Sequence, residues 1–221
     1  MNLPNKLTLL RVILIPFFLV MMYVDAIPLH FLWALVIFAA ASLTDMLDGK
    51  IARARGLVTN FGKFLDPLTD KVLVITALTV FVELKEFRMS AIPLVIIIAR
   101  EFMVSGLRLL AAEEGVVIAA GIWGKLKTAF TMVTIVGVMA YLSLAYDFGL
   151  AVPDFVKTWI LGALIWISTA LTIISGLVYL KGCWKYIVPV LNTRQGDKLI
   201  FSNPDAASQS DENSTFSHQH Q

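Results

Sequence analysis

Long apolar stretches dominate this chain of 221 residues, and each is close to the length needed to cross a bilayer. A helix spans the hydrocarbon core with ~20 mostly apolar residues. With 58% hydrophobic and only 15% charged residues, the composition excludes an ordinary soluble domain. Because lipid offers no partners to backbone polar groups, the stretches are expected to be helices. The sequence thus predicts an all-α integral membrane protein with six transmembrane helices, at 7–24, 30–48, 66–83, 90–112, 126–147 and 156–180.

Lysine and arginine are distributed unevenly over the connections between these stretches. Basic residues gather at the N-terminus, in the connections near residues 49–65 and 108–127, and after residue 180. The connection at 25–29 has no Lys or Arg, the one at 83–88 has two acidic and two basic residues, and the one at 147–157 is nearly neutral. Cytoplasmic connections are the basic ones. The pattern predicts that both termini are cytoplasmic. No small-x-small cleavage site follows the apolar residues 12–24, so the first helix is expected to stay uncleaved.

The composition changes towards the C-terminus. Residues 203–221 are rich in Ser, Asn, Gln, Asp and His, which cannot bury a core. We therefore expect a six-helix domain over residues 1–185 and a polar, disordered tail over residues 186–221. The single cysteine, Cys183, excludes an internal disulfide and a multi-cysteine metal site.

Four aspartates fall where the second apolar stretch ends and the third begins: Asp45, Asp48, Asp66 and Asp70. Each pair is three or four residues apart and so shares a helix face. Like charges at this spacing repel, and they are costly to desolvate near a membrane. Oxygen ligands without His or Cys suit hard cations, so the cluster predicts a site for two Mg²⁺ or Mn²⁺ ions. The alternative is that these are helix-end acids that face water or pair with Lys50 or Arg53.

The residues around the aspartates add geometry to this prediction. Gly49 and Gly62 flank an expected loop from Gly49 to Lys63 and leave room for a ligand. Asp66 precedes Pro67, which favours the first turn of a helix, so the third helix is expected to begin there. An antiparallel helix pair would bring the four carboxylates together. Two metal ions held in this way could clamp a pyrophosphate.

The spacing of this segment carries a family resemblance. The pattern Asp45-x-x-Asp48-Gly49-x-x-Ala52-Arg53, then eight residues, then Gly62-x-x-x-Asp66-x-x-x-Asp70 resembles the complete signature of the CDP-alcohol phosphotransferases. The resemblance implies a six-helix membrane enzyme, usually a homodimer, over about residues 1–185. It also implies that the four aspartates bind two divalent ions and that Asp70 is the general base for the acceptor hydroxyl. Residues expected to bind the CDP-lipid are Gly49, Ala52, Arg53 and Gly62.

Further segments are similar to the branch of this family that joins CDP-diacylglycerol to sn-glycerol 3-phosphate. They include residues 2–8 with Arg11, residues 62–71, 99–102 and 106–108, and residues 124–128. This similarity implies a bacterial cell membrane and a nucleotide or phosphate role for Asn5, Thr8 and Arg11, although an N-terminal capping or interface role fits all three residues equally well.

A second basic group, on the expected cytoplasmic side, predicts where the phosphate of an anionic acceptor binds. The candidates for this acceptor site are Arg100, Arg108, Lys125 and Lys127. Two alternatives stand beside this interpretation. Arg100 and Glu101 interrupt an apolar run and could form a mutual or interhelical ion pair. Lys125 and Lys127 could be loop charges that only set the orientation in the membrane.

Two other kinds of function fit parts of this pattern. Within the family, the acceptor could be phosphatidylglycerol, serine or an inositol phosphate, although serine lacks a phosphate for the basic group to bind. Outside the family, six helices with carboxylates could form a cation transporter. Transporters place such acids near the bilayer midplane on broken helices of paired repeats, whereas these acids lie towards one interface and no repeat is visible.

Overall fold

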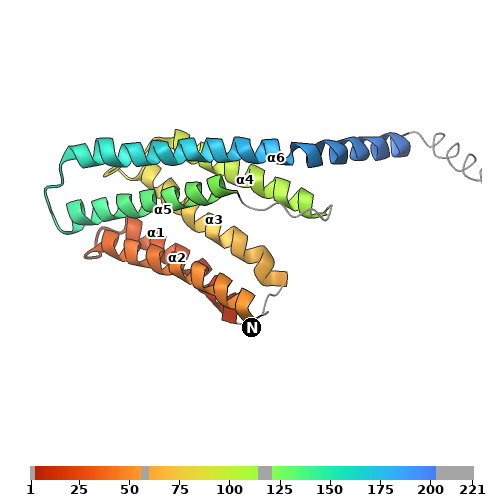
Figure 1. Ribbon diagram of the computed structural model, residues 1–221. Coiled ribbons are helices and arrows are strands. Elements are labelled where there is room, and N and C mark those ends of the chain that lie inside the picture. The colour runs from red at the N-terminus through yellow and green to blue at the C-terminus, as the bar shows by residue number, and fades with distance from the viewer. Residues whose placement is uncertain (1–2, 56–59, 114–120, 203–221) are drawn as a thin grey trace, which may run out of the picture. The chain divides into compact units, whose positions relative to one another are not determined.

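The computed structural model describes the backbone of residues 3–55, 60–113 and 121–202, and the side chains of residues 9–44, 69, 71–111 and 121–183. Every regular element in these ranges is a helix, which confirms the predicted all-α class for the described residues (Figure 1). In chain order the elements are α1 (Leu3–Tyr23), α2 (His30–Arg55), α3 (Asn60–Glu83), α4 (Ala91–Glu113), α5 (Ile122–Leu142), the π-helices η1 (Ser143–Asp147) and η2 (Val156–Leu161), and α6 (Gly162–Ser202).

The connection between α2 and α3 is shorter than predicted. The sequence predicted a loop from Gly49 to Lys63, but α2 continues to Arg55 and α3 already begins at Asn60. Residues 50–55 are mostly strong helix formers, and a single glycine costs only ~1 kcal/mol in a helix. Pro67 therefore does not start α3, and the residues of the aspartate signature are almost all helical.

Helix α6 also differs from the prediction. It continues to Ser202, so residues 186–202, which were expected to be part of a disordered tail, are helical. Residues 186–191 still carry mostly apolar side chains, and this extends the helical pattern of the preceding segment. The expected tail after residue 202 lies outside the described residues.

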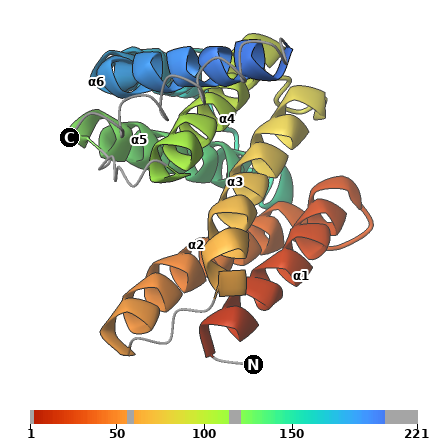
Figure 2. The same cartoon turned by 90° about the vertical axis from the view of Figure 1, so that its right-hand side faces the viewer.

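The chain divides into two compact units. Unit 1 comprises residues 1–103 and 120–176, and unit 2 comprises residues 104–119 and 177–221. In unit 1, α1 packs against α2 and α3, and α5 packs against the same two helices (Figures 1 and 2). Fully buried side chains from these four helices form its core, among them Phe18, Phe38, Phe81 and Ile135. Unit 2 has its own small apolar cluster of Val104, Leu107, Tyr179 and Cys183.

Many large apolar side chains are exposed on these helices. Examples are Phe17, Trp33, Ile92, Val133 and Trp166. Extended apolar surface of this kind is unusual for a protein in water and is typical of helices that face lipid. Among the described residues, the segments Ile122–Asp147 and Val156–Cys183 are long and apolar enough to cross a membrane, and Leu9–Tyr23 and His30–Thr44 are shorter apolar helices.

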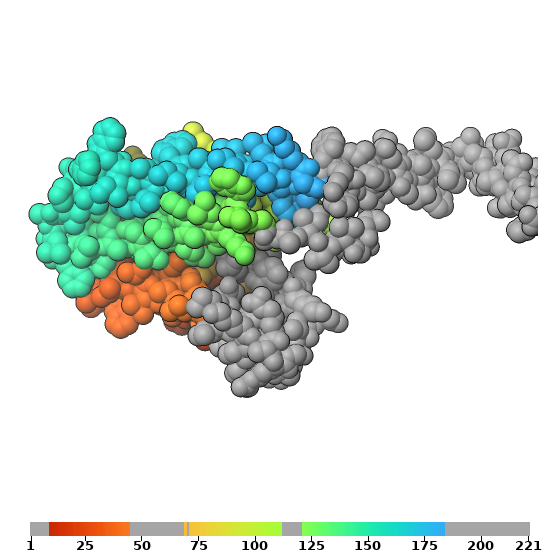
Figure 3. Space-filling view, viewed as in Figure 1, coloured from red at the N-terminus to blue at the C-terminus, as the bar shows by residue number. Residues whose placement is uncertain are grey.

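Aromatic side chains are concentrated where α5 turns into α6. The two π-helices and residues 148–155 between them lie at one end of the face shown in Figure 3. Exposed aromatic residues there are Tyr146, Phe148, Phe155 and Trp159. Aromatic belts of this type mark the boundary between lipid and water. This end of unit 1 therefore fits an interfacial position.

A carboxylate from η1 caps the N-terminus of α2. Asp147 accepts hydrogen bonds from the backbone N–H of Leu32 at 2.7 Å and of Phe31 at 3.4 Å. These N–H groups have no partner within the helix, and the positive end of the helix dipole favours the carboxylate. We expect Asp147→Ala to lower the free energy of unfolding by ~1 kcal/mol. Thermal unfolding in detergent measures this, with exposed Asp154→Ala as the control; equal effects of the two changes would contradict the capping role.

Candidate functional site

The aspartate signature lies on two helices that contact each other. Asp45 and Asp48 are three residues apart in α2, and Asp66 and Asp70 are four residues apart in α3. Each pair therefore occupies one face of its helix. The side chains of the aspartates lie outside the described residues, as do those of Gly49, Ala52, Arg53, Gly62, Asn5 and Thr8. The donor set itself, four carboxylates without sulfur or nitrogen ligands, has the chemistry that Mg²⁺ and Mn²⁺ require.

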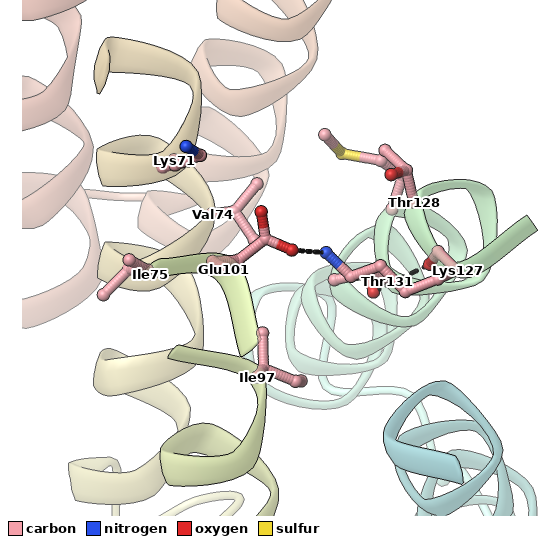
Figure 4. A pocket seen from close by; sticks show the side chains of 9 residues that line it. Lys71, Val74, Ile75, Ile97, Glu101, Lys127, Thr128 and Thr131 are labelled. Atoms are coloured by element: carbon pink, nitrogen blue, oxygen red, sulfur yellow. Dashed lines mark hydrogen bonds and ion pairs between the residues drawn. The ribbon is translucent and has the colours of Figure 1, made fainter. Parts of the chain in front are cut away.

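A small cavity begins where the aspartate signature ends. Its volume is about 50 Å³, and it is lined by Lys71, Val74, Ile75, Ile97, Glu101, Lys127, Thr128, Thr131 and Met132 (Figure 4). Lys71 directly follows Asp70, and position 74 is one helical turn beyond position 70. With its small volume and the charged side chains in its wall, the cavity suits a small polar group better than an acyl chain.

Opposite charges meet in the cavity wall. Glu101 on α4 accepts a hydrogen bond from the ammonium of Lys127 on α5, drawn as a dashed line in Figure 4. The same oxygen, Oε1, accepts a bond from Nη1 of Arg100 at 2.9 Å. Nη2 of Arg100 donates to Oγ of Ser175 at 2.6 Å. The side chains of Arg100, Glu101 and Lys127 are only 12%, 16% and 7% exposed, so this is a nearly buried ion network.

The four predicted acceptor residues belong to both units: Arg100, Lys125 and Lys127 to unit 1, and Arg108 to unit 2. The structure brings Arg100 and Lys127 together on Glu101, which confirms the ion pair that was the alternative interpretation of Arg100. Lys127 is buried within α5, so the alternative that it is a loop charge is wrong. Lys125 is exposed near the start of the same helix. Arg108 belongs to unit 2, where its guanidinium lies 5.4 Å from the centre of the Tyr179 ring.

Arg11 is the one predicted nucleotide-site residue whose side chain is described. Arg11 lies in α1 and is fully buried. Among the described residues it is the largest of the fully buried side chains. A guanidinium keeps its charge, so burial is stable only beside acidic or phosphate groups. Its burial therefore speaks against N-terminal capping and fits an electrostatic or interface role inside unit 1.

Lys71 and Thr128 are among the cavity residues that were given no role from the sequence. Lys71 reaches the cavity from α3, and Thr128 reaches it from α5. The position of Lys71 directly after the last aspartate was a signal for it, since a cation beside an acidic cluster is placed to meet an anionic ligand. Thr128 had no such signal, because its contribution depends on how α5 is rotated.

A larger cavity of about 240 Å³ lies near the connection between α3 and α4. Its wall includes Arg88, Ser90, Lys157 and Trp166, and no predicted site residue. Lys157 there donates to the backbone carbonyl of Glu86 at 2.6 Å, so its ammonium helps to fix a loop. Volume alone favours this cavity, but the smaller one adjoins the aspartate helix and holds a converging set of charges. These charges make the smaller cavity the candidate functional site.

Comparison with known proteins agrees with the signature. The family model described as CDP-alcohol phosphatidyltransferase matches residues 1–174. A model of the D2 domain of MACPF proteins matches only residues 182–220, a short segment that assigns no family.

The matches to three relatives cover nearly the full length of each relative. A protein of Bacillus subtilis is 40% identical over 196 residues, which cover 83% of this chain and 96% of the relative. Proteins of Rickettsia bellii and Yersinia enterocolitica are 39% and 37% identical, and the matches cover 84% of this chain and 97% and 96% of those relatives. All three are named CDP-diacylglycerol–glycerol-3-phosphate 3-phosphatidyltransferase. With the family model matching most of its length, this chain belongs to the CDP-alcohol phosphatidyltransferase family.

Proposed function

We propose that this protein transfers a phosphatidyl group from CDP-diacylglycerol to sn-glycerol 3-phosphate, giving phosphatidylglycerophosphate and CMP. The observation that carries the proposal is the cavity that begins directly after Asp70 and holds the ammonium of Lys127 in its wall. A hydroxyl at the aspartates and a phosphate at this cavity are the two ends of such an acceptor. The names of the relatives support the same reaction.

The chemistry follows from the residues in order. Asp70 accepts the proton of the acceptor hydroxyl, and the oxygen then attacks the β-phosphorus of CDP-diacylglycerol. A new P–O bond forms between the β-phosphorus and the acceptor oxygen. The bond from the β-phosphorus to the bridging oxygen breaks, and CMP leaves with that oxygen and the electron pair. Two divalent ions held by Asp45, Asp48, Asp66 and Asp70 would neutralise the charge that develops on the pyrophosphate. Gly49, Ala52 and Gly62 would leave room for the nucleotide, and Arg53 would pair with its phosphate.

The setting of the reaction is also part of the proposal. Six transmembrane helices with both termini in the cytoplasm would place the aspartates at the inner face of a bacterial cell membrane. The acyl chains of CDP-diacylglycerol could then stay in the bilayer while the headgroup enters the site. A homodimer is expected from the family resemblance. Arg108 and Lys125 are kept as further candidates for binding the acceptor phosphate.

The decisive experiment measures CMP release by the purified protein in detergent. CDP-diacylglycerol and Mg²⁺ or Mn²⁺ are supplied with one acceptor at a time: sn-glycerol 3-phosphate, phosphatidylglycerol, serine or inositol phosphate. We expect release only with sn-glycerol 3-phosphate. Release with another alcohol would keep the mechanism and replace the acceptor, and folded protein that releases CMP with none of them would overturn the proposal.

A further inference from the structure

Glu101 is an acid in the wall of a cavity that is otherwise suited to an anion. The cationic side chains of Lys71 and Lys127 line the same cavity. A carboxylate in this place repels a phosphate, so its presence needs a reason. Figure 4 shows Glu101 entering from α4 and meeting Lys127 from α5.

The carboxylate is itself fixed from behind. Arg100 donates to Oε1 of Glu101, and its other terminal nitrogen is held by Ser175 on α6. The absence of a side chain at Gly176 makes room for this arginine, since a Cβ there would lie 3.2 Å from its Cγ. Arg100 does not line the cavity, whereas Glu101 and Lys127 both do. The contacts therefore form one continuous chain, from Ser175 and Gly176 through Arg100 and Glu101 to Lys127.

We infer that Glu101 is a positioning residue that holds the Lys127 ammonium at the cavity wall, ready for the acceptor phosphate; this inference rests on the proposed function. A lysine has a flexible stem that carries ~2 kcal/mol of rotamer entropy. A carboxylate that orders it in advance lowers the cost of ordering when the phosphate binds. Lys127 has three N–H donors and gives one of them to Glu101, so two remain to meet the phosphate. Arg100, on the far side of Glu101, helps the cluster to stay cationic.

The first test is Glu101→Gln, which removes the charge and keeps the shape. We expect the KM for sn-glycerol 3-phosphate to rise about tenfold, equivalent to about 1.4 kcal/mol of binding. The KM for CDP-diacylglycerol is expected to stay within about twofold, because that substrate is bound elsewhere. Glu83→Gln is the matched control, since Glu83 also accepts a hydrogen bond, from the Tyr23 hydroxyl at 2.7 Å, but does not line the cavity. It should leave both KM values unchanged.

A double-mutant cycle shows whether Glu101 acts through Lys127. Lys127→Gln alone should raise the acceptor KM, and Glu101→Gln combined with it should raise the KM no further, because the residue to be positioned is already gone. Effects that multiply, or equal changes in both KM values, would overturn the inference. If Glu101→Gln does not fold, Glu101→Asp keeps the charge, and its acceptor KM should also rise; an unchanged value there would contradict the positioning role.

The outcome separates this inference from the proposed function. Wild-type protein that makes no product from sn-glycerol 3-phosphate would overturn both. Wild-type turnover with an unchanged acceptor KM in the folded Glu101 variants would overturn the positioning role alone. Thermal unfolding of each variant is measured in the same detergent. A change in KM counts only where the variant unfolds at the temperature of the wild type, because a misfolded variant could also lose binding.

Discussion

Replacing Asp70 by Asn is expected to lower the rate of CMP release by about 1,000-fold or more. General-base catalysis alone contributes ~10²–10⁴-fold. The amide cannot take the proton of the acceptor hydroxyl and is a weaker metal ligand than a carboxylate, so both proposed functions of this position are lost together. Asn has nearly the shape of Asp, so α3 should remain intact. The measurement is CMP release with saturating CDP-diacylglycerol, sn-glycerol 3-phosphate and Mg²⁺.

The control is the same substitution at Asp25, an exposed residue in the connection between α1 and α2 whose side chain is 90% exposed. We expect Asp25→Asn to keep the wild-type rate within about twofold. Thermal unfolding of both variants should match that of the wild type to within a few degrees. Normal turnover by Asp70→Asn would rule out its assignment as the base and leave the mechanism without a proton acceptor.

The helices could be predicted because the signal for them is long and local. Each of the six apolar stretches overlaps a helix. An apolar stretch of ~20 residues can be recognised from the sequence without knowing how the helices pack. The ends of the helices were less predictable. At residues 49–63 the glycines suggested a loop, but helix formers such as Ala52 and Arg53 outweigh one glycine, and the helix continues to Arg55. Local turn signals thus failed where the neighbouring residues all favour a helix.

The candidate site was predictable only in part. The aspartates and Arg53 follow from fixed spacing, which is a property of the sequence alone. The contact between Glu101 and Lys127 joins residues 26 positions apart, and it depends on how α4 and α5 rotate against each other. A loop charge stayed open as the alternative for Lys127 because charge patterns do not show burial. Tertiary packing decides which charged side chains of two helices meet, so Lys127 could not be named as the partner of Glu101 from the sequence.

The second large effect is expected when divalent metal is removed. We expect excess EDTA to abolish CMP release and Mg²⁺ or Mn²⁺ to restore it. Four carboxylates on two contacting helices repel one another, so a bound cation would relieve a cost that the apo site carries. Oxygen-only donor sets bind hard divalent ions, whose charge offsets this repulsion and supports the attack on a pyrophosphate.

A stability measurement tests the metal site independently of turnover. A ligand that binds only the folded state stabilises it by ~2.7 kcal/mol at a concentration of 100 times its Kd. Mg²⁺ should therefore raise the unfolding temperature of the wild type and of Asp25→Asn, and raise that of Asp66→Asn much less. Full activity in EDTA, or an equal Mg²⁺ effect on all three proteins, would contradict a metal centre at the aspartates. The four carboxylates would then need another source of positive charge. The buried guanidinium of Arg11 would be the first candidate, and Arg11 would be the first residue to substitute.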